Sequence, residues 1–238
     1  MNTPQCVIAL SANAGISLTL GMRRVWIDAL HTGAGPFSKI TAEVRAKMLT
    51  DPAFAEPDAI CFSHCHPDHY SHEMTMKMAP RWPKAKLILP RMDFDRQITL
   101  SGAEQTEHVG GMTFRFLKTR HAGGERLAVP LYSILVTDGT TRILIPGDCA
   151  VGDPELLKLT GGLPVDVAVL NFPWITRRDG RAFLREQIQA GHLLVYHLPF
   201  EEDDRYGYRA ATEAEAEKMR SLTDVRILAR PMQTEILY

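Results

Sequence analysis

Side chains that can bind a divalent cation crowd into one short run of the chain, His64-Cys65-His66-Pro67-Asp68-His69. The apolar residues before this run, Ala59–Ser63, predict a short β-strand. Side chains two positions apart on a strand point to the same side, so His64 and His66 can reach one cation. The proline turns the chain out of the strand, which displaces Asp68 and His69 toward a second cation. We therefore interpret the run as a metal site, with ligands that suit zinc and that iron and manganese also accept.

Three later residues have the same ligand chemistry, and each closely follows an expected strand. They are His121, Asp148 and His197. Taken singly, a histidine at a strand end is more often a hydrogen-bonded surface residue, and an aspartate after Pro-Gly is typical of a turn. Their assignment to the metal site therefore depends on the order in which all these residues occur along the chain.

Taken in that order, the run and the three later residues resemble the metal-binding pattern of the metallo-β-lactamase superfamily. The resemblance implies that His121 completes the first metal's ligands, that Asp148 bridges both metals and that His197 completes the second metal's ligands. The full implied ligand set is His64, His66, Asp68, His69, His121, Asp148 and His197. It also implies a catalytic role for Asp68, which would orient the attacking hydroxide. The segment Val25-Trp26-Ile27-Asp28 resembles the family's early strand, whose aspartate usually supports the site without binding metal.

The order of elements suits an α/β fold in which two sheets pack face to face with helices outside. The resemblance implies the four-layer αββα sandwich of the metallo-β-lactamase type. Periodicity and turn residues predict strands at Gln5–Leu10, Ile16–Leu20, Arg24–Leu30, Ala59–Ser63, Lys86–Leu89, Thr106–Val109, Thr113–Thr119, Leu131–Thr137, Arg142–Ile145, Val165–Leu170, Leu193–Tyr196 and Val225–Leu228. Helices are expected at Lys39–Leu49, with Ser38 as N-cap, at Ser71–Met78, with Ser71 as cap, at Phe183–Gln189 and at Ala211–Arg220. No linker or repeat interrupts this order, so we expect one domain over residues 1–238.

Composition excludes several classes of function. Lys and Arg number 27 against 28 Asp and Glu, a formal net charge of −1, which lacks the basic footprint of a dedicated nucleic-acid binder. No apolar run approaches membrane-spanning length, and the N-terminus does not resemble a signal peptide. Four cysteines without framework spacing are typical of reduced thiols. We therefore expect a cytoplasmic protein with a small-molecule substrate and no nucleic-acid or membrane partner; the sequence indicates no oligomeric state.

The resemblance implies a hydrolase in which two divalent metal ions activate a bridging hydroxide. Zinc is expected, with Mn²⁺ or Fe²⁺ as alternatives. We expect none of the added helical domain, tRNA-binding arm or second domain of larger relatives, and this expectation favours a small ester, lactone, thioester or phosphodiester substrate. Two other functions stay open: a catalytically silent metal-binding or scaffold protein of the same fold, and a redox or dioxygenase-type relative that uses iron.

Three residues in loops are candidate substrate contacts. His31 follows Asp28 in a loop that the family places near the rim of the active site. Trp174 and Arg205 belong to the loops Asn171–Arg178 and Phe200–Tyr208, which follow expected strands at the same edge. Aromatic and guanidinium groups there suit an anionic substrate, but they are also typical of an ordinary surface loop, which is the more common case.

Overall fold

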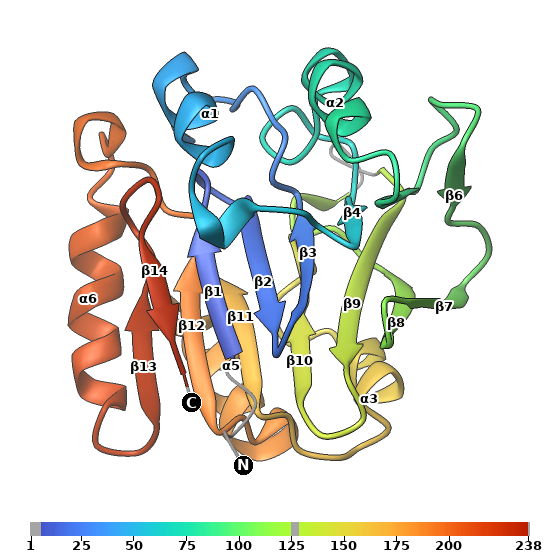
Figure 1. Cartoon of the computed structure of the whole chain (residues 1–238). Helices are drawn as coiled ribbons and strands as arrows, with labels where there is room; N and C mark the ends of the chain where they lie inside the picture. The colour runs from blue at the N-terminus through green and yellow to red at the C-terminus, as the bar shows by residue number, and fades with distance from the viewer. Residues whose placement is uncertain (1–5, 125–128, 238) are drawn as a thin grey trace.

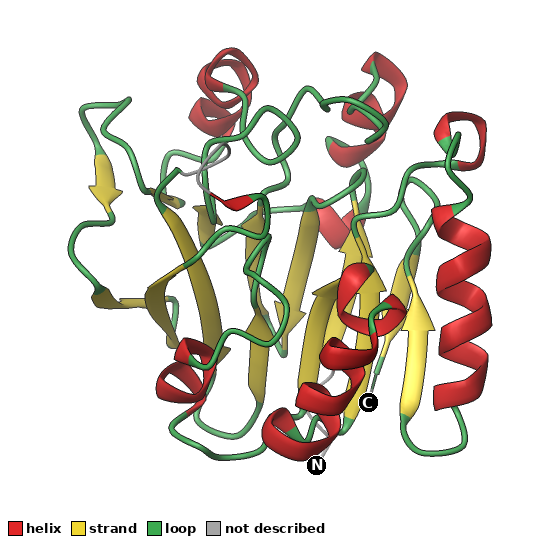
Figure 2. Cartoon of the chain, turned by 180° about the vertical axis from the view of Figure 1, so that it is seen from behind, coloured by secondary structure: helices red, strands yellow, loops and turns green. Residues whose placement is uncertain are grey.

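Two seven-stranded β-sheets lie face to face, with helices on the outer sides of the sandwich (Figures 1 and 2). This computed structural model describes residues 6–124 and 129–237, so the expected start of the first strand at Gln5 lies outside the described residues. The architecture is the expected αββα sandwich of the α/β class.

The first sheet holds the N-terminal strands and one C-terminal strand, in the order β14-β1-β2-β3-β4-β5-β6. The strands are β1 (Cys6–Leu10), β2 (Ile16–Leu20), β3 (Arg23–Ile27), β4 (Ala59–Cys61), β5 (Lys86–Leu89), β6 (Gln97–Thr99) and β14 (Thr234–Ile236). Strands β14 and β1 to β3 pair antiparallel, and β3 to β6 pair parallel.

The second sheet has the order β13-β12-β11-β10-β9-β8-β7. Its strands are β7 (Glu104–Val109), β8 (Met112–Thr119), β9 (Leu131–Thr137), β10 (Arg142–Ile145), β11 (Val167–Asn171), β12 (His192–Tyr196) and β13 (Asp224–Ile227). Strands β7 to β10 pair antiparallel, and β10 to β13 pair parallel.

The central parallel strands of the second sheet, β11 and β12, are mainly apolar because both of their faces are buried. On β11, Val167 and Val169 belong to the core between the two sheets, whereas Ala168 and Leu170 belong to a separate core beneath the outer helices. Because successive side chains point to opposite faces of the sheet, one strand contributes residues to both cores. The second sheet is therefore packed on both of its faces.

The helices are short. They are α1 (Ala42–Met48), α2 (His72–Met78), α3 (Glu155–Thr160), α4 (Pro173–Thr176), α5 (Arg178–Phe183), the π-helical turn η4 (Leu184–Ile188) and α6 (Tyr208–Met219). The 3₁₀ turns are η1 (Pro52–Phe54), η2 (Ala79–Arg81) and η5 (Glu201–Asp203). Among the α-helices, only α1 and α2 of the described chain have an N-cap side chain that accepts a hydrogen bond from the helix. Ser71 caps α2 as predicted, since its hydroxyl accepts a hydrogen bond from the Met74 amide. None of the described helices has the length and apolarity needed to cross a membrane.

The prediction that Ser38 caps the first helix is wrong. Helix α1 begins at Ala42, and Thr41 is its N-cap. The Ser38 hydroxyl instead donates to the Asp203 carboxylate and accepts from the Phe200 amide. Ser38 therefore fastens the loop before α1 to the loop after β12, a tertiary contact that local sequence does not indicate.

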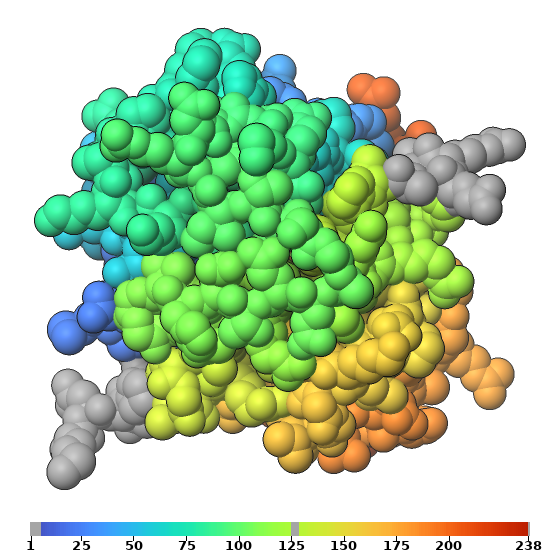
Figure 3. All heavy atoms as spheres, turned by 90° about the vertical axis from the view of Figure 1, so that its right-hand side faces the viewer, coloured from blue at the N-terminus to red at the C-terminus, as the bar shows by residue number. Residues whose placement is uncertain are grey.

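Several other predicted boundaries also differ from the structure. The segment expected as a loop at Asn171–Arg178 contains α4, and the helix expected at Phe183–Gln189 begins earlier, as α5, and continues as the π-helical turn η4. Helix α6 starts at Tyr208, before the predicted start, because the Asp204 carboxylate accepts hydrogen bonds from the first amides of the helix. Helix α3 and strands β6 and β14 were not predicted. The segment around β6 and β7 covers the edge of the sandwich seen in Figure 3.

Candidate metal centre

The candidate ligands follow strands whose carboxyl ends meet at one end of the sandwich. In the first sheet, β3 and β4 run parallel and lead to Asp28 and to the run that begins at His64. In the second sheet, β8, β10 and β12 share a direction and lead to His121, Asp148 and His197. Residues far apart in sequence thus meet because the strand directions are shared.

The structure brings the seven predicted ligands into two adjacent groups. Within each group, the candidate ligand atoms lie within 4.8 Å of one another. The first group is His64, His66 and His121, and the second is Asp68, His69, Asp148 and His197. The sequence resemblance implies the same two groups of ligands, except that it assigns Asp148 to both metals.

The spacing in the second group fits a single cation. Nε2 of His69 lies 3.4 Å from Oδ2 of Asp148, and Nε2 of His197 lies 3.3 Å from Oδ1 of the same carboxylate. Nε2 of His197 also lies 3.6 Å from Oδ2 of Asp68. Two ligands at zinc-bonding distance and tetrahedral angle are about 3.3 Å apart. The distances between these side chains therefore suit tetrahedral coordination.

Asp148 also faces the first group. Its Oδ2 atom lies 3.6 Å from Nε2 of His121 and 3.9 Å from Nε2 of His64. Both of these ring nitrogens are buried and without a hydrogen bond among the described residues. Buried polar atoms are normally paired, so unpartnered imidazole nitrogens that point at a carboxylate fit a site built for a cation.

Asp28 orients the ligands from behind. Its carboxylate is fully buried and accepts hydrogen bonds from the Ser63 amide at 2.7 Å, from the Ser63 hydroxyl at 2.6 Å and from Nδ1 of His69 at 2.9 Å. When His69 donates its Nδ1 proton to Asp28, its Nε2 lone pair points into the metal groups. A carboxylate behind a ligating histidine fixes the ring's tautomer and orientation in this way.

Ser63 orients the ring of His64 in a similar way, through a hydrogen bond. The Ser63 hydroxyl has one proton, and that proton goes to Asp28, so the oxygen accepts from Nδ1 of His64 at 2.9 Å. Nε2 of His64 is then the unprotonated nitrogen that faces Asp148. Sequence reasoning named Asp28 as a supporting residue but missed Ser63, whose type and position are ordinary for the end of a strand.

The charges of the site are strongly coupled. Burial lowers the pKa of His64 well below its ordinary value, and His69 adds to that effect. Burial alone would also lower the pKa of His69, but Asp148 and Asp28 outweigh it and raise that pKa well above the usual value. Burial raises the pKa of Asp148, yet His197 and His69 hold it well below its ordinary range. Asp148 is therefore an ionised carboxylate at neutral pH, as a metal ligand must be.

Two asparagines that sequence reasoning missed also support the site. The Asn171 amide donates to Oδ1 of Asp148 at 3.2 Å, and the Asn13 amide donates to the backbone oxygen of Asp68 at 3.2 Å. Asn13, Asp28 and His197 all have positive φ angles, of 46°, 53° and 60°. Such backbone angles are costly for residues other than glycine and often mark functional sites. No spacing in the sequence indicates either asparagine.

The three predicted substrate contacts lie in different surroundings. His31 is fully buried and bonds the Ala12 carbonyl through Nε2 at 2.9 Å. Trp174 is also fully buried, in the core beneath the outer helices, where it packs on Phe183. Neither side chain offers surface to a substrate in this structure, because loops expected to be exposed are packed against cores. Only Arg205 is exposed and lines a pocket.

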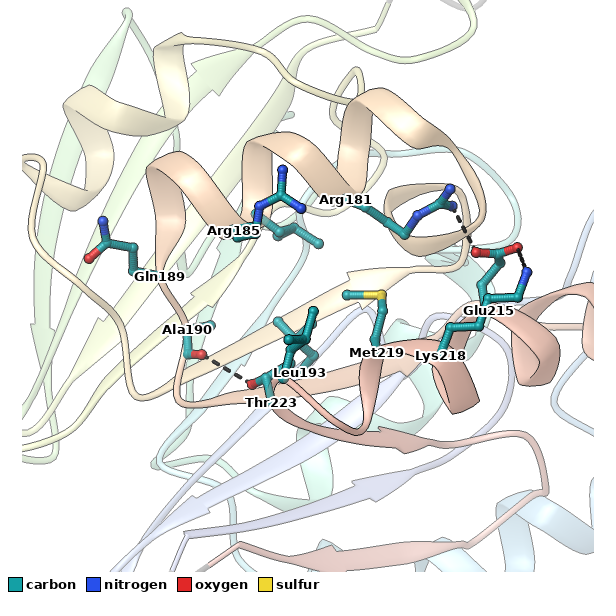
Figure 4. Close-up of a pocket in the computed structure, with 11 residues that line it drawn as sticks. Arg181, Arg185, Gln189, Ala190, Leu193, Glu215, Lys218, Met219 and Thr223 are labelled. Carbon is teal, nitrogen blue, oxygen red and sulfur yellow. Dashed lines mark hydrogen bonds and ion pairs between the residues drawn. The ribbon is translucent and has the colours of Figure 1, made fainter.

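That pocket has a volume of about 560 Å³, and none of the candidate ligands lines it. Phe37, one of its lining residues, places its ring edge-on against the ring of His197, with centroids 4.4 Å apart. A second pocket of about 580 Å³ lies between η4 and α6, and Figure 4 shows Arg181, Lys218 and Met219 around it. It begins beside Leu193, near the amino end of β12, and contains none of the candidate ligands.

Comparison with solved structures shows the same fold over nearly the whole chain. The metallo-β-lactamase fold protein YhfI from Bacillus subtilis is 17% identical and has a TM-score of 0.69, with 99% of this chain and 100% of that chain covered. An isothiocyanate hydrolase from Delia radicum gut bacteria is 16% identical, with a TM-score of 0.65 and coverage of 96% and 98%. CmlA, a diiron β-hydroxylase from Streptomyces venezuelae, is 12% identical, with a TM-score of 0.66; the match covers 99% of this chain and 54% of CmlA.

No curated protein sequence matches the chain. The family profile described as a beta-lactamase superfamily domain matches residues 23–197. This range contains every candidate metal ligand and well over half of the chain. Together, the profile, the αββα sandwich and the cluster of histidines and aspartates at one end of it establish that the chain belongs to the metallo-β-lactamase superfamily.

Proposed function

We propose that the protein is a hydrolase that uses two divalent metal ions, zinc in the first instance, to cleave a small ester, lactone, thioester or phosphodiester. The observation that carries this proposal is the position of Asp148. Its carboxylate lies within 4 Å of histidine nitrogens from both ligand groups. One carboxylate that faces two groups of ligands is an arrangement that suits a two-metal site.

In this proposal, His64, His66 and His121 would hold one ion, Asp68, His69 and His197 would hold the other, and Asp148 would serve both. Bound cations would lower the pKa of a water molecule toward neutrality and polarise a carbonyl or phosphoryl oxygen. The protein contributes preorganisation, because Asp28 and Ser63 hold the histidine rings in place before substrate arrives.

Asp68 has the position of a residue that orients the nucleophile. Its carboxylate lies beside His197, and its backbone is held by the Asn13 amide. A carboxylate can accept a proton from a water molecule at this place and align the remaining lone pair toward the substrate. We assign this proton-holding role to Asp68, in addition to its role as a ligand.

The open side of the site favours a small substrate. Among the seven candidate ligands, only His66 and Asp148 are partly exposed, and the others are buried. A substrate therefore reaches the site where these two side chains meet solvent. The similarity in fold to an isothiocyanate hydrolase supports hydrolysis of a small molecule and adds isothiocyanates to the compounds worth testing.

The test is hydrolysis of a substrate panel by protein loaded separately with Zn²⁺, Mn²⁺ or Fe²⁺. The panel contains lactones, aryl esters, thioesters, phosphodiesters and isothiocyanates. We expect at least one class to be cleaved, with activity lost on chelation and restored by metal, and we expect Asp68→Asn to lose most of it. Metal-loaded protein that cleaves none of them would contradict the proposal.

The two alternative functions, a redox protein and a catalytically silent binding protein, predict different results in the same experiment. A redox protein would consume oxygen only in the iron-loaded form and would hydrolyse nothing. A catalytically silent binding protein would take up metal with neither activity. The intact set of candidate ligands favours a catalyst over a catalytically silent binding protein.

A further inference from the structure

The pocket beside the candidate metal centre contains two cations that are not neutralised. Lys39 and Arg205 both line it, and both side chains are exposed. Neither forms an ion pair with another residue in ranges 6–124 and 129–237. Elsewhere on the surface, Arg91 and Arg177 are paired with neighbouring aspartates, whereas Lys84 and Arg96 also have no ion pair among the described residues.

The one carboxylate that lines this pocket is already engaged. Asp203 accepts a hydrogen bond from the Ser38 hydroxyl at 2.8 Å, and that hydroxyl accepts from the Phe200 amide at 2.8 Å. Glu201 and Glu202 lie in the same turn but do not line the pocket. The residues that line the pocket therefore include two cations and one carboxylate, a formal net charge of +1 on a protein whose formal net charge is −1.

The wall of the pocket is joined directly to the metal-binding run. The amides of Thr32 and Gly33 donate to the Pro67 carbonyl at 3.0 and 3.1 Å, immediately before Asp68. Gly33 has a φ of 78°, and a Cβ there would lie 2.9 Å from the Phe37 carbonyl oxygen and the Lys39 Cα. Only glycine allows this loop to fold so closely onto the residues that follow it.

Aromatic side chains give the pocket an apolar surface as well. Phe37 stands between the pocket and His197, and Tyr206 is exposed at the pocket's lining. A molecule bound at the metal centre would have to pass the Phe37 ring to reach Lys39 and Arg205. Guanidinium and ammonium groups bind carboxylate and phosphate oxygens through charge-assisted hydrogen bonds.

We infer that the substrate carries a second, anionic group, a carboxylate or a phosphate, which Lys39 and Arg205 bind while Phe37 packs against the body of the molecule. The inference rests on the proposed function in one respect, namely that the reactive bond lies at the metal centre. Binding of the anion itself requires only the pocket. The two statements can therefore be tested separately.

Binding is measured with probes that need no turnover. Phenylacetate and phenyl phosphate are titrated into metal-loaded protein, with phenylacetamide as the uncharged match, and their dissociation constants are compared. We expect at least one anionic probe to bind more tightly than phenylacetamide and Lys39→Met/Arg205→Leu to weaken it about tenfold or more. Lys158→Met, which removes a lysine paired with Glu155 on α3, should change nothing.

Anions can also bind the metal ions directly, and Asp148→Ala separates this case. An anionic probe that still binds metal-depleted Asp148→Ala but not the double variant supports the pocket and identifies carboxylate or phosphate as its preferred group. A probe that binds the double variant normally and fails to bind Asp148→Ala overturns the inference. Equal binding of charged and uncharged probes to the wild type also overturns it.

Turnover adds a second readout if the substrate panel yields an activity. For a substrate with a distal carboxylate or phosphate, the double variant should raise KM about tenfold with little change in kcat. The uncharged analogue should show neither change. A wild type that binds the anionic probes without hydrolysing anything would contradict the proposed function and leave the anion site standing.

Discussion

Asp28 provides the most informative perturbation because it binds no metal in this account, yet it orients two of the ligands. Asp28→Asn keeps the size of the side chain and replaces one carboxylate oxygen with an NH₂ group. If the amide oxygen serves the Ser63 hydroxyl and His69, the NH₂ group must face the Ser63 amide, which is also a donor. The opposite orientation loses the bond to His69. Either way, at least one charge-assisted hydrogen bond is lost.

The size of the effect follows from that lost bond. A hydrogen bond to a charged group contributes about 1.5–3 kcal/mol, which corresponds to about 10- to 150-fold in a binding constant. Substitutions behind metal-ligating histidines typically weaken metal binding about 10- to 100-fold. We therefore expect Asp28→Asn to weaken binding of the more loosely held metal ion by about 10- to 100-fold while the protein remains folded.

The assay is competition for Zn²⁺ against a chromophoric chelator, with circular dichroism to verify folding. Ser17→Ala is the matched control for loss of a buried hydrogen bond, because the Ser17 hydroxyl bonds the Ala53 carbonyl and contacts no candidate ligand. Ser63→Ala should behave like Asp28→Asn, since it leaves Nδ1 of His64 without an acceptor. Wild-type affinity in folded Asp28→Asn, or an equal loss in Ser17→Ala, would refute the orienting role.

Three further substitutions test other parts of the site. Asp148→Ala should lose at least one metal ion because one carboxylate faces both groups, whereas Asp68→Asn should keep most metal and lose turnover; elemental analysis beside activity measurements decides, and the reverse pattern would exchange the two roles. Asn171→Ala should weaken metal binding several-fold in the chelator assay, since its amide holds Oδ1 of Asp148, and an unchanged affinity would count against that contact. Burial lowers the pKa of His31 to about 4, below its unfolded value, so the unfolded state binds the proton first and stability falls as the pH drops from 6.5 to 4. That loss is on the order of 3 kcal/mol in metal-free protein and should be absent from His31→Gln in urea unfolding; parallel pH profiles for the two proteins would contradict it.

The elements that were predictable from the sequence are those in which one local pattern decides the outcome. Buried strands such as β9 and β10 are apolar runs between turn residues, and the structure confirms both with the predicted bounds. Short edge strands such as β6 have no comparable pattern, because pairing with a neighbour creates them. Ser38 shows the same limit for helix starts, since its partners lie more than 160 residues away.

The candidate site also contains both residues that could be predicted from the sequence and residues that could not. Histidines and aspartates closely spaced or following strands are rare enough to be noticed, and all seven predicted ligands lie together in the structure. Asn171 and Ser63 act by hydrogen bonds across the fold, and neither residue type is unusual at a strand end. Trp174 illustrates the opposite error: an aromatic residue in an expected loop suggested a surface contact, but a short helix buries it.

The central claim is that one chain holds two metal ions through two groups of side chains that meet at Asp148. The most direct test is elemental analysis of protein reconstituted with Zn²⁺ and freed of excess metal by gel filtration, with protein concentration from amino-acid analysis. We expect about two ions per chain in the wild type. We expect that replacing His197 with alanine leaves about one. Protein that retains one ion or none per chain, or whose metal content does not respond to the loss of His197, would contradict it.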